Sequence, residues 1–512
     1  MLQKLSNLRL PIDFDNSVIA RQIQKKLGNY RFVKIDKLSL DSRRKNDIHY
    51  VASVIVDGNP NHNLQEYKEK LSQIKQLVNC KVDLSSRPII IGSGPCGMFA
   101  GLVLAHYGLS PIIFEGGDKV ENRSKIVTNF NLGGDLCENT NIQFGEGGAG
   151  TFSDGKLNTG ISSEYISVVL NEFVRHGAKE DILYSAKPHI GTDILKNVVK
   201  NIRNTIVSLG GEYKFNHKVD EIVIKDGRVA GVKAKGVTYE SENVILACGH
   251  SARDTIKKLY SQGVNMSAKA FAVGARVEHS QQLIDIGQYG NTKGLPAADY
   301  KLSHRLSSGS GCFTFCMCPG GYVMPSMSEK NTVVTNGMSE NKRDSGFANS
   351  AVLVGIEPKD YGDGVLDGFD YQQRLERLAF DIGKSYAAPA VKVSDFIDGK
   401  VTKNIADIKS TYARGLECAD FQKVFDKKVV DGMREGLVAF GKKINGFDKN
   451  GILIGVESRS SSPVRIDRDD KGMSNIVGLY PSGEGAGFAG GITSSAVDGI
   501  KTALKLVQNN KQ

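Results

Sequence analysis

The strongest constraint on the fold of this chain is an uncharged segment of 27 residues, 88–114. It reads PIIIGSGPCGMFAGLVLAHYGLSPIIF, and Glu115 follows it. A membrane-spanning helix needs about 20 consecutive apolar residues, but three glycines and a proline fall near the start of this segment. Such a cluster would interrupt a spanning helix close to its beginning. We therefore expect no membrane span here.

The same segment fits the start of a dinucleotide-binding domain. Residues 88–91 predict a buried strand, 98–107 a helix and 110–114 a second strand. The turn between the first strand and the helix, GSGPCG at 92–97, has the G-x-G-x-x-G spacing. Its glycines permit a tight turn, close approach of a pyrophosphate and close packing of helix on strand. The helix N-terminus offers free N–H groups to the phosphates.

Glu115 lies where an acid accepts hydrogen bonds from both hydroxyls of a ribose and disfavours a 2′-phosphate. Two later segments favour FAD over NAD. VILACG (244–249) resembles the segment that returns beneath the cofactor in flavoproteins. GLYPSGEGAGFAGG (478–491) resembles a late flavoprotein motif whose acidic residue binds the ribityl chain. That residue is usually Asp, and here it is Glu484.

Two further positions complete the expected FAD site. Arg123 is placed near the adenosine end, and Val219 is placed to contact adenine through its backbone. The expected cofactor-binding residues are Gly92, Gly94, Pro95, Cys96, Gly97, Glu115, Arg123, Gly145, Val219, Cys248, Gly249, Gly483, Glu484, Gly491 and Ile492. No other stretch reads strand, G-x-G-x-x-G, helix, strand and acid, so NAD(P)H is expected only as a transient electron donor.

GEGGAG (145–150) also has the G-x-G-x-x-G spacing. No second strand ending in an acid follows it, so we do not interpret it as a second nucleotide site. It is expected to lie along the flavin or to close over it; the alternative is a glycine-rich surface loop.

Several long motifs resemble a bacterial family of poorly characterised FAD-dependent proteins, usually labelled FAD-dependent dehydrogenases or NAD(P)/FAD-dependent oxidoreductases. The motifs are NIQFGEGGAGTFSDGKL, FAVGARVEH, FTFCMCPGGYV, VVTNGMS, GVESRSSSPVRI and YPSGEGAGFAGGITSSAVDGI. The resemblance covers nearly the whole chain, including DSRRKNDIHYV near its start. It implies FAD and an oxidoreductase, and it implies no particular substrate.

The expected fold class is α/β, with a Rossmann-like FAD-binding domain of the single-nucleotide-domain flavoprotein type, an inserted α+β substrate domain and a small N-terminal α+β domain. We expect the N-terminal domain at 1–83, the FAD-binding domain at 84–265 and 451–512, and the substrate domain at 266–450. Helical spacing is present at 17–27, 64–78 and 192–209. Residues 219–234 predict a hairpin with an Asp-Gly turn.

Three residues are candidates for catalysis. Cys316 and Cys318 in FCMCPGG would point to the same face of an extended strand. They could form a strained disulfide, pass electrons to the flavin or protonate a reduced substrate, or they could be buried core cysteines. Lys156 in SDGK could act as an acid near the flavin, or it could be solvated.

Two arginines are candidates for substrate binding. Arg459 and Arg465 flank SSSPV and could hold a carboxylate or phosphate bidentately. They could equally pair with acids such as Glu457 at a domain junction. His250 and His279 are interpreted mainly as histidines with local hydrogen bonds. The sequence contains no metal-ligand pattern and no catalytic-triad order.

Net charge is +10, and residues 1–86 carry 15 Lys and Arg against 9 Asp and Glu, an excess of +6. This basic region indicates either a solvated surface or contact with a polyanion such as RNA; nucleic-acid binding is not the favoured interpretation, because no aromatic-rich RNA motif accompanies it. The eight cysteines lack a CxxC pair, so we expect reduced thiols in a cytoplasmic protein. The first residues lack the apolar region of a secretory signal.

The sequence thus predicts an FAD-dependent dehydrogenase or reductase that transfers hydride between a small-molecule substrate and FAD. Electrons would come from NAD(P)H, from a carrier protein or from the substrate itself. The alternatives are a flavin monooxygenase and an RNA-associated flavoprotein.

Overall fold

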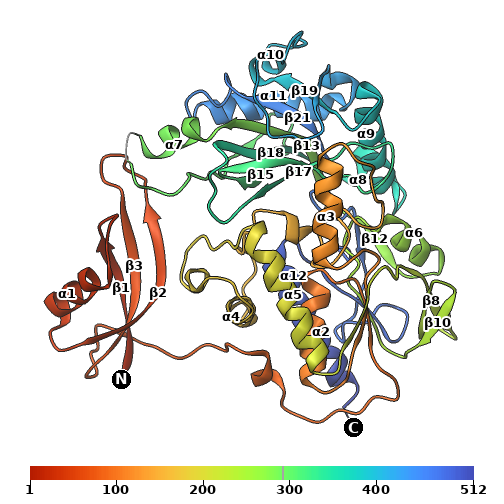
Figure 1. The fold of residues 1–512 in the computed structure, drawn as a ribbon, viewed down its shortest axis with the longest axis horizontal. Coiled ribbons are helices and arrows are strands. Elements are labelled where there is room, and N and C mark those ends of the chain that lie inside the picture. Colours follow the sequence, from red (N-terminus) through yellow and green to blue (C-terminus); the bar gives the residue numbers. More distant parts are fainter. Residues whose placement is uncertain (291–292, 512) are drawn as a thin grey trace.

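A computed structural model of the chain describes residues 1–290 and 293–511. Figure 1 shows a small N-terminal domain beside a larger body, joined to it by a long connecting segment that runs below the body. The body has a parallel sheet covered by helices and, above it, a second and larger sheet. The chain is therefore a mixed α/β protein, as expected.

The parallel sheet has five strands in the order β23-β11-β5-β6-β7. Its strands are β5 (Ile89–Ile91), β6 (Ile112–Phe114), β7 (Glu212–Lys214), β11 (Val244–Leu246) and β23 (Leu479–Pro481). Neighbouring strands pair in parallel throughout. The first strand after the N-terminal domain thus lies in the middle of the sheet, with the last strand of the chain at one edge, as in doubly wound dinucleotide-binding folds.

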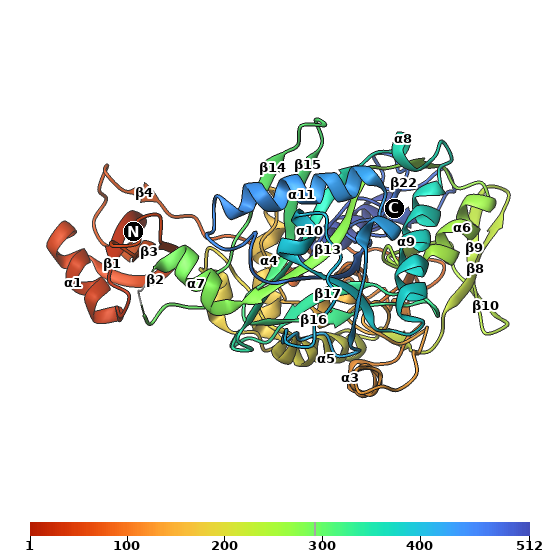
Figure 2. The same cartoon turned by 90° about the horizontal axis from the view of Figure 1, so that it is seen from above.

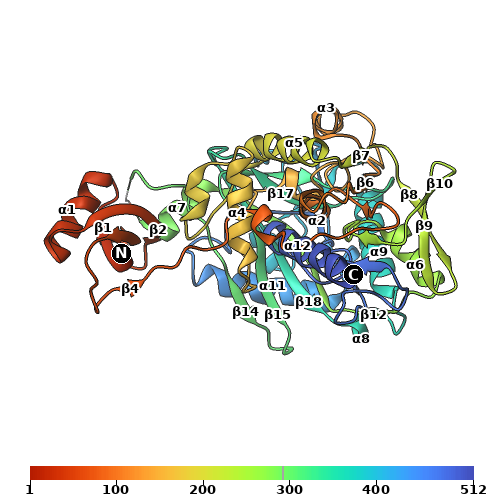
Figure 3. The same cartoon turned by 90° about the horizontal axis from the view of Figure 1, so that it is seen from below.

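Three long helices cover one face of this sheet: α2 (Pro95–His106), α5 (Thr192–Ser208) and α12 (Ile492–Asn509). They lie close together in Figure 3, with α2 in contact with both α5 and α12. α2 begins with Pro95 directly after the N-cap Gly94, and every residue from 96 to 105 is buried. This all-round burial explains why the segment carries no charge.

The predicted hairpin is part of a three-stranded antiparallel meander at the end of the body. Its strands are β8 (Val219–Lys225), β9 (Arg228–Ala234) and β10 (Val237–Glu240). Asp226 and Gly227 form the turn with φ of 50° and 72°, as the right-handed strand twist of a two-residue hairpin requires. The remaining helices of this domain are α3 (Val120–Asn131), α4 (Tyr165–Arg175) and α6 (Arg253–Ser261).

The second sheet, here called the cap sheet, has seven strands in the order β14-β15-β18-β13-β21-β19-β20. These are β13 (Phe271–Ser280), β14 (Ser303–Arg305), β15 (Gly311–Cys318), β18 (Phe347–Ile356), β19 (Ala388–Lys392), β20 (Leu416–Cys418) and β21 (Ile452–Glu457). β21 pairs with β13 and β19. The cap sheet thus extends to Glu457, beyond the expected boundary at 450, because this strand completes its centre.

Helices and a small ribbon complete the cap. The helices are α7 (Gln281–Tyr289), α8 (Pro358–Tyr361), α9 (Asp367–Gly383), α10 (Val393–Ile397) and α11 (Lys427–Gly441). β16 (Gly321–Pro325) pairs with β17 (Thr335–Ser339). One further antiparallel pair, β12 (Met266–Ala268) with β22 (Val464–Ile466), marks where the chain enters and leaves the cap.

The N-terminal domain has one helix, α1 (Asn16–Leu27), packed on a sheet of order β2-β3-β1-β4. Its strands are β1 (Leu2–Leu10), β2 (Arg31–Asp41), β3 (His49–Asp57) and β4 (Gln65–Glu66). Figure 2 shows it at one end of the elongated molecule. It meets the body where Leu38 exchanges backbone hydrogen bonds with Tyr184 and Ala186.

The helix predicted at 64–78 is wrong. The segment contains β4, an irregular stretch and a single 3-10 turn, Ile74–Leu77. Leu64 packs against the N-terminal core, whereas Ile74 and Leu77 are buried against the dinucleotide-binding domain. Apolar residues that serve two separate cores cannot share one helical face.

No helix among residues 1–290 and 293–511 is long and apolar enough to cross a membrane.

Candidate functional site

A cavity of about 1100 Å³ lies between the carboxyl ends of the parallel strands and the cap sheet. Ile91, Phe114 and Ala247, at or just after the ends of β5, β6 and β11, line it from below. Phe315 and Asn336 line it from the cap. Ligands of open parallel sheets bind at this edge of the sheet, so this cavity is the candidate site.

Most of the expected cofactor-binding residues line the cavity. They are Gly92, Gly94, Pro95, Cys96, Glu115, Gly145, Val219, Cys248, Gly249, Glu484, Gly491 and Ile492. Gly97, Arg123 and Gly483 do not line it. These three residues lie behind the residues that line the cavity and contact them.

The geometry of the glycine turn fits a dinucleotide pyrophosphate. A Cβ on Gly92, which has φ 101°, would clash with the carbonyl oxygen of Ala247, and one on Gly97 would clash with that of Gly92. A Cβ on Gly94 would meet only the Cα of Gly148, at 3.8 Å, so its outer side faces the open cavity. Gly92 and Gly97 are needed for the turn itself, and Gly94 leaves room for a ligand beside the N-terminus of α2.

Glu115 is buried and accepts four hydrogen bonds. Its carboxylate receives the backbone N–H of Ser93 at 3.0 Å, the Ser93 hydroxyl at 2.7 Å, and the N–H groups of Gly117 at 2.8 Å and Gly145 at 3.2 Å. It therefore joins the glycine turn to the second glycine-rich loop. The same carboxylate lines the cavity, where a ribose hydroxyl can take the place of the Ser93 hydroxyl as a donor to it.

The second glycine-rich loop (145–150) closes over the first. The backbone N–H of Gly147 donates to the Ser93 carbonyl at 2.9 Å. A Cβ on Gly148 would come within 3.0 Å of the Cα of Gly94, so the two loops meet backbone to backbone. The loop is part of the cavity wall rather than a separate nucleotide site.

Arg123 holds this loop in place from behind. Its guanidinium is fully buried and donates to the carbonyls of five residues: Asn141, Ile142, Gly145, Glu146 and Gly148. Burial lowers the pKa of Arg123 to about 10, and Glu115 and Glu146 oppose that shift. The expectation that Arg123 contacts adenosine is corrected, because its side chain is fully buried behind the loop and does not line the cavity.

The 482–484 turn is held by a residue that the sequence did not indicate. Asp498 of α12 accepts the N–H of Gly483 at 2.7 Å, the Ser482 hydroxyl at 3.0 Å and two hydrogen bonds from Arg468. Burial would raise the pKa of Asp498, but Arg468 and these hydrogen bonds lower it. The thiol of Cys96 donates to Ser482 at 3.1 Å, and burial raises its pKa.

Glu484 and His250 form a weakly paired couple on the cavity wall. His250 Nδ1 is 3.7 Å from Glu484 Oε1, beyond hydrogen-bond distance. Burial raises the pKa of Glu484 to about 7. Burial, with the charges of Arg459 and Arg253, lowers the pKa of His250 to about 3. At neutral pH the histidine is therefore uncharged, and the raised pKa favours the protonated form of the glutamate more than in an exposed carboxyl.

Lys156 lines the cavity and is paired. Its ammonium donates to Asp154 at 2.9 Å and to the carbonyl of Met317 in the cap. Asp154 also receives two hydrogen bonds from Arg343. Burial would raise the pKa of Asp154, but Lys156 and Arg343 lower it well below its usual range. Lys156 is thus a charged link between the two domains at the cavity.

Cys316 and Cys318 do not lie on a regular strand. β15 loses its register with β18 between Phe315 and Cys318, and Cys316 has φ 43°. This bulge breaks the two-residue alternation on which the shared face was predicted. Both residues line the cavity, but Cys316 is exposed there and Cys318 is buried. The surrounding cavity walls desolvate the Cys316 thiol and raise its pKa to about 12, although Arg276 acts in the opposite direction.

Arg276 supports the cap side of the cavity from behind. It is fully buried and pairs with Glu457 through two hydrogen bonds of 2.8 Å. It also donates to the Cys316 carbonyl at 3.1 Å. Glu457 thus pairs with Arg276, and neither of the arginines expected for substrate binding uses it.

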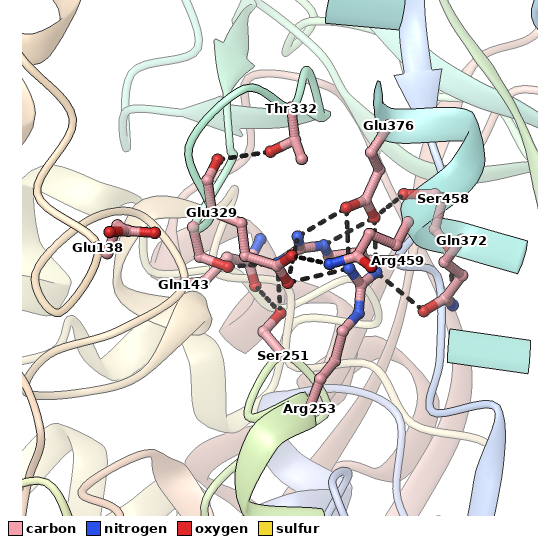
Figure 4. Close-up of polar contacts among 12 residues, drawn as sticks. Glu138, Gln143, Ser251, Arg253, Glu329, Thr332, Gln372, Glu376, Ser458 and Arg459 are labelled. Atoms are coloured by element: carbon pink, nitrogen blue, oxygen red, sulfur yellow. Dashed lines mark hydrogen bonds and ion pairs between the residues drawn. The ribbon is translucent and has the colours of Figure 1, made fainter. Parts of the chain in front are cut away.

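Arg459 and Arg465 are not a pair. Arg459 lines the cavity, whereas Arg465 is exposed on β22 and stacks on Phe488. The arginine that shares a binding partner with Arg459 is Arg253, at the N-terminus of α6. Both guanidiniums bind the buried carboxylate of Glu376 (Figure 4). The chain between β21 and β22 is irregular, so residues 459 and 465 do not share one face.

His279 is buried in the cap, where its Nε2 lies 3.0 Å from the Phe447 carbonyl. Within the described parts of the chain, no group of three His, Cys, Asp or Glu side chains could hold a metal ion.

The parallel sheet, the glycine turn and the cavity above it define a flavoprotein-type dinucleotide-binding fold. Residues 270–460, essentially the cap, match the family described as "FAD-dependent protein, C-terminal domain-like". A Clostridium beijerinckii protein, described as uncharacterized, is 42% identical over 527 residues and covers 99% of both chains. The chain belongs to this poorly characterised family of FAD-dependent proteins.

The solved structures to which this chain is similar are more distant. A geranylgeranyl bacteriochlorophyll reductase-like protein of Thermoplasma acidophilum is 13% identical, with a TM-score of 0.36 over 82% of this chain and 78% of that chain. Glycerol-3-phosphate dehydrogenase from Bacillus halodurans, complexed with FAD, is 13% identical, with a TM-score of 0.38 over 86% and 67% of the two chains. Glycine oxidase from Geobacillus kaustophilus is 10% identical, with a TM-score of 0.34 over 83% and 95%.

Proposed function

We propose that this protein is an FAD-dependent oxidoreductase that transfers hydride between a small-molecule substrate and FAD. The observation that carries the proposal is the single cavity of about 1100 Å³, which runs from the glycine turn and Glu115 to the cap residues Cys316 and Asn336. This volume is at the upper end for small-molecule sites. A dinucleotide and a second, smaller molecule would fit together in it.

Each part of the wall has a binding role in this proposal. The N-terminus of α2 and Gly94 receive the pyrophosphate, Glu115 accepts ribose hydroxyls, and Glu484 accepts hydroxyls of the ribityl chain. Bound FAD supplies hydride exchange at its ring system. The cap residues exclude water from the space above and position the substrate. Lys156, charged and held by Asp154, can stabilise negative charge at this end.

A dehydrogenase or reductase is favoured over a monooxygenase and over an RNA-associated role. The cap provides sites for the substrate, and the candidate electron donors are NADH, NADPH, a carrier protein and the substrate itself. All eight cysteines are free, which supports a cytoplasmic location.

The proposal is tested by isolating the protein and recording its visible spectrum. We expect a yellow protein with one FAD for each chain. The bound flavin is then exposed anaerobically to NADH, NADPH and a panel of metabolites, and bleaching identifies the reductant. Oxygen consumption coupled to a hydroxylated product would favour the monooxygenase instead. A colourless protein that cannot be reconstituted with FAD would refute the proposal.

A further inference from the structure

Two arginines at the cavity wall share one buried glutamate. Arg253 donates to the two oxygens of Glu376 at 3.0 and 2.7 Å. Arg459 donates to the same two oxygens at 3.0 and 2.8 Å. Figure 4 shows both guanidiniums converging on this carboxylate. Glu376 has no exposed surface, and it comes from α9 of the cap.

One carboxylate neutralises only one of the two guanidiniums. Burial would raise the pKa of Glu376, but Arg253 and Arg459 lower it well below its usual range, so it is ionised at neutral pH. Arg253 and Arg459 are themselves more than nine-tenths buried. A buried positive charge without a partner is costly, and this pair therefore needs a second anion.

Glu329 supplies that second negative charge from the side of the cavity. Its carboxylate lies 3.0 Å from Arg253 Nη1 and 3.6 Å from Arg459 Nη2. Gln373 donates to it at 2.5 Å. Unlike Glu376, the Glu329 side chain is 26% exposed, and Arg253, Arg459, Gln373 and Glu329 all line the cavity.

Ser328 adds a neutral donor at the same place. Its hydroxyl oxygen accepts from Arg459 Nη1 at 2.5 Å and lines the cavity. Among the described residues its own hydroxyl proton has no acceptor, so the proton is available to an anion. Two guanidiniums, an amide and a hydroxyl together make the donor set expected around a carboxylate or phosphate.

We propose that Arg253, Arg459 and Ser328 bind an anionic group of the substrate, a carboxylate or a phosphate, and that Glu329 occupies this position until the substrate displaces it. The inference rests on the proposed function and names its substrate class. Exchange of one carboxylate for another keeps the charge of the wall balanced, so displacement of Glu329 costs little desolvation. A cationic or neutral group that displaced Glu329 would leave the arginines without their second partner.

The test uses the FAD-loaded protein, with benzoate, inorganic phosphate and the neutral isostere benzamide as probes. Binding is measured by calorimetry and by the change in flavin absorbance. We expect benzoate or phosphate to bind at least about tenfold more tightly than benzamide, as charge-assisted hydrogen bonds require. Phosphate alone would identify a phosphate ester as the substrate, and benzoate alone a carboxylic acid.

Three variants are expected to change the anion affinity in three different ways. Glu329→Gln removes the competing charge and keeps both arginines, so the preferred anion should bind about tenfold more tightly. Arg459→Lys removes the bidentate fork and should weaken the same anion about tenfold. Arg465→Lys, a matched change outside the cavity, should leave its affinity unchanged. A purely structural cluster would not give tighter binding in Glu329→Gln.

Several outcomes would overturn the inference. One is equal affinity for benzoate, phosphate and benzamide, and another is no gain in Glu329→Gln, which tests the idea even if Arg459→Lys fails to fold. If Arg459→Lys loses FAD but keeps its anion affinity, the guanidinium serves the cofactor phosphates instead. Absence of FAD would refute the proposed function, and the calorimetric titration would still decide on the anion site.

Discussion

Asp498 accepts a hydrogen bond from the backbone N–H of Gly483 at 2.7 Å, although one residue lies in α12 and the other in the loop after β23. The same carboxylate accepts two hydrogen bonds from Arg468. The turn that presents Glu484 to the cavity is therefore fixed by a charged residue that does not touch the cavity. Its position depends on an ion pair.

Asp498→Asn should destabilise the protein and loosen this turn. The amide cannot neutralise Arg468, and a broken, largely buried pair costs on the order of 3 kcal/mol. Because the pKa of Asp498 is lowered in the folded state, its contribution is present above the ordinary aspartate pKa of about 3.9 and is lost as the pH falls below that value. The difference in unfolding free energy between wild type and variant should therefore shrink below about pH 4. The exposed Asp470→Asn is the control, and a difference as large at pH 2 as at pH 7 would contradict this account.

Gly94→Val should abolish FAD binding while the protein still folds. A Cβ at this position meets nothing closer than 3.8 Å within the protein, so the added side chain enters the space of the pyrophosphate. Gly160→Val is the matched control, because Gly160 is exposed and a Cβ there meets nothing within 4 Å. Flavin absorbance after purification measures the effect, with circular dichroism to check folding. Full FAD occupancy in Gly94→Val would place the pyrophosphate elsewhere.

Arg123→Lys should destabilise the loop at 145–150. Lysine has three donors, so at least two of the five carbonyls bound by Arg123 would lose their partner, and each buried loss costs about 1–3 kcal/mol. We expect a lower thermal midpoint, faster proteolysis within 141–150 and reduced FAD affinity. The reverse change on the same helix, Lys125→Arg, should have no effect, since Lys125 is exposed. An unchanged midpoint in Arg123→Lys would mean that the loop is held by other contacts.

Glu484→Gln should change how the cofactor-free protein responds to pH. The pKa of Glu484 is about 7 in the folded protein, against about 4.3 when unfolded. The folded state thus binds more protons, and this group lowers stability as the pH rises between these values. The variant lacks that loss, so its stability relative to wild type should increase from pH 5 to pH 8 in chemical denaturation. If the unfolding free energies of the two proteins changed with pH in parallel, the pKa of Glu484 would not be raised in the folded state.

Cys316 should react slowly with thiol reagents despite its exposure to the cavity. With its pKa raised to about 12, the thiolate fraction at pH 8 is on the order of one in ten thousand. We expect mass spectrometry to show alkylation by iodoacetamide at least about a hundredfold slower than for free cysteine. Cys316→Ser should still allow anaerobic flavin reduction. Rapid labelling, together with loss of reduction in the serine variant, would instead support the redox role considered from the sequence.

The dinucleotide-binding part of the fold could be predicted because its signals are local. The glycine spacing at 92–97, the apolar strands on either side and Glu115 stand within one short segment. The Asp-Gly turn at 226–227 is similarly local, and both are present in the structure. The segment 64–78 misled prediction because helical spacing says nothing about which core each apolar residue joins.

The support of the site could not be predicted, because it depends on contacts between distant segments. Asp498 and Gly483 pair across a loop, and Arg253 meets Glu376 from another domain. Arg459 was identified, but its neighbour Arg465 in the sequence is not its partner in space. Two residues that are close in the sequence need not be close in space where the chain passes from one domain to another, as it does between β21 and β22.

The chain enters and leaves the cap through two adjacent strands. Met266 is paired with Ile466, and Ala268 with Val464, so the ends of the inserted region lie side by side. The cap is therefore an insertion whose length or sequence can change between these strands without altering the strand order of the parallel sheet. Changes within residues 269–463 can therefore alter the cap side of the cavity, while the flanking halves keep one nucleotide-binding frame.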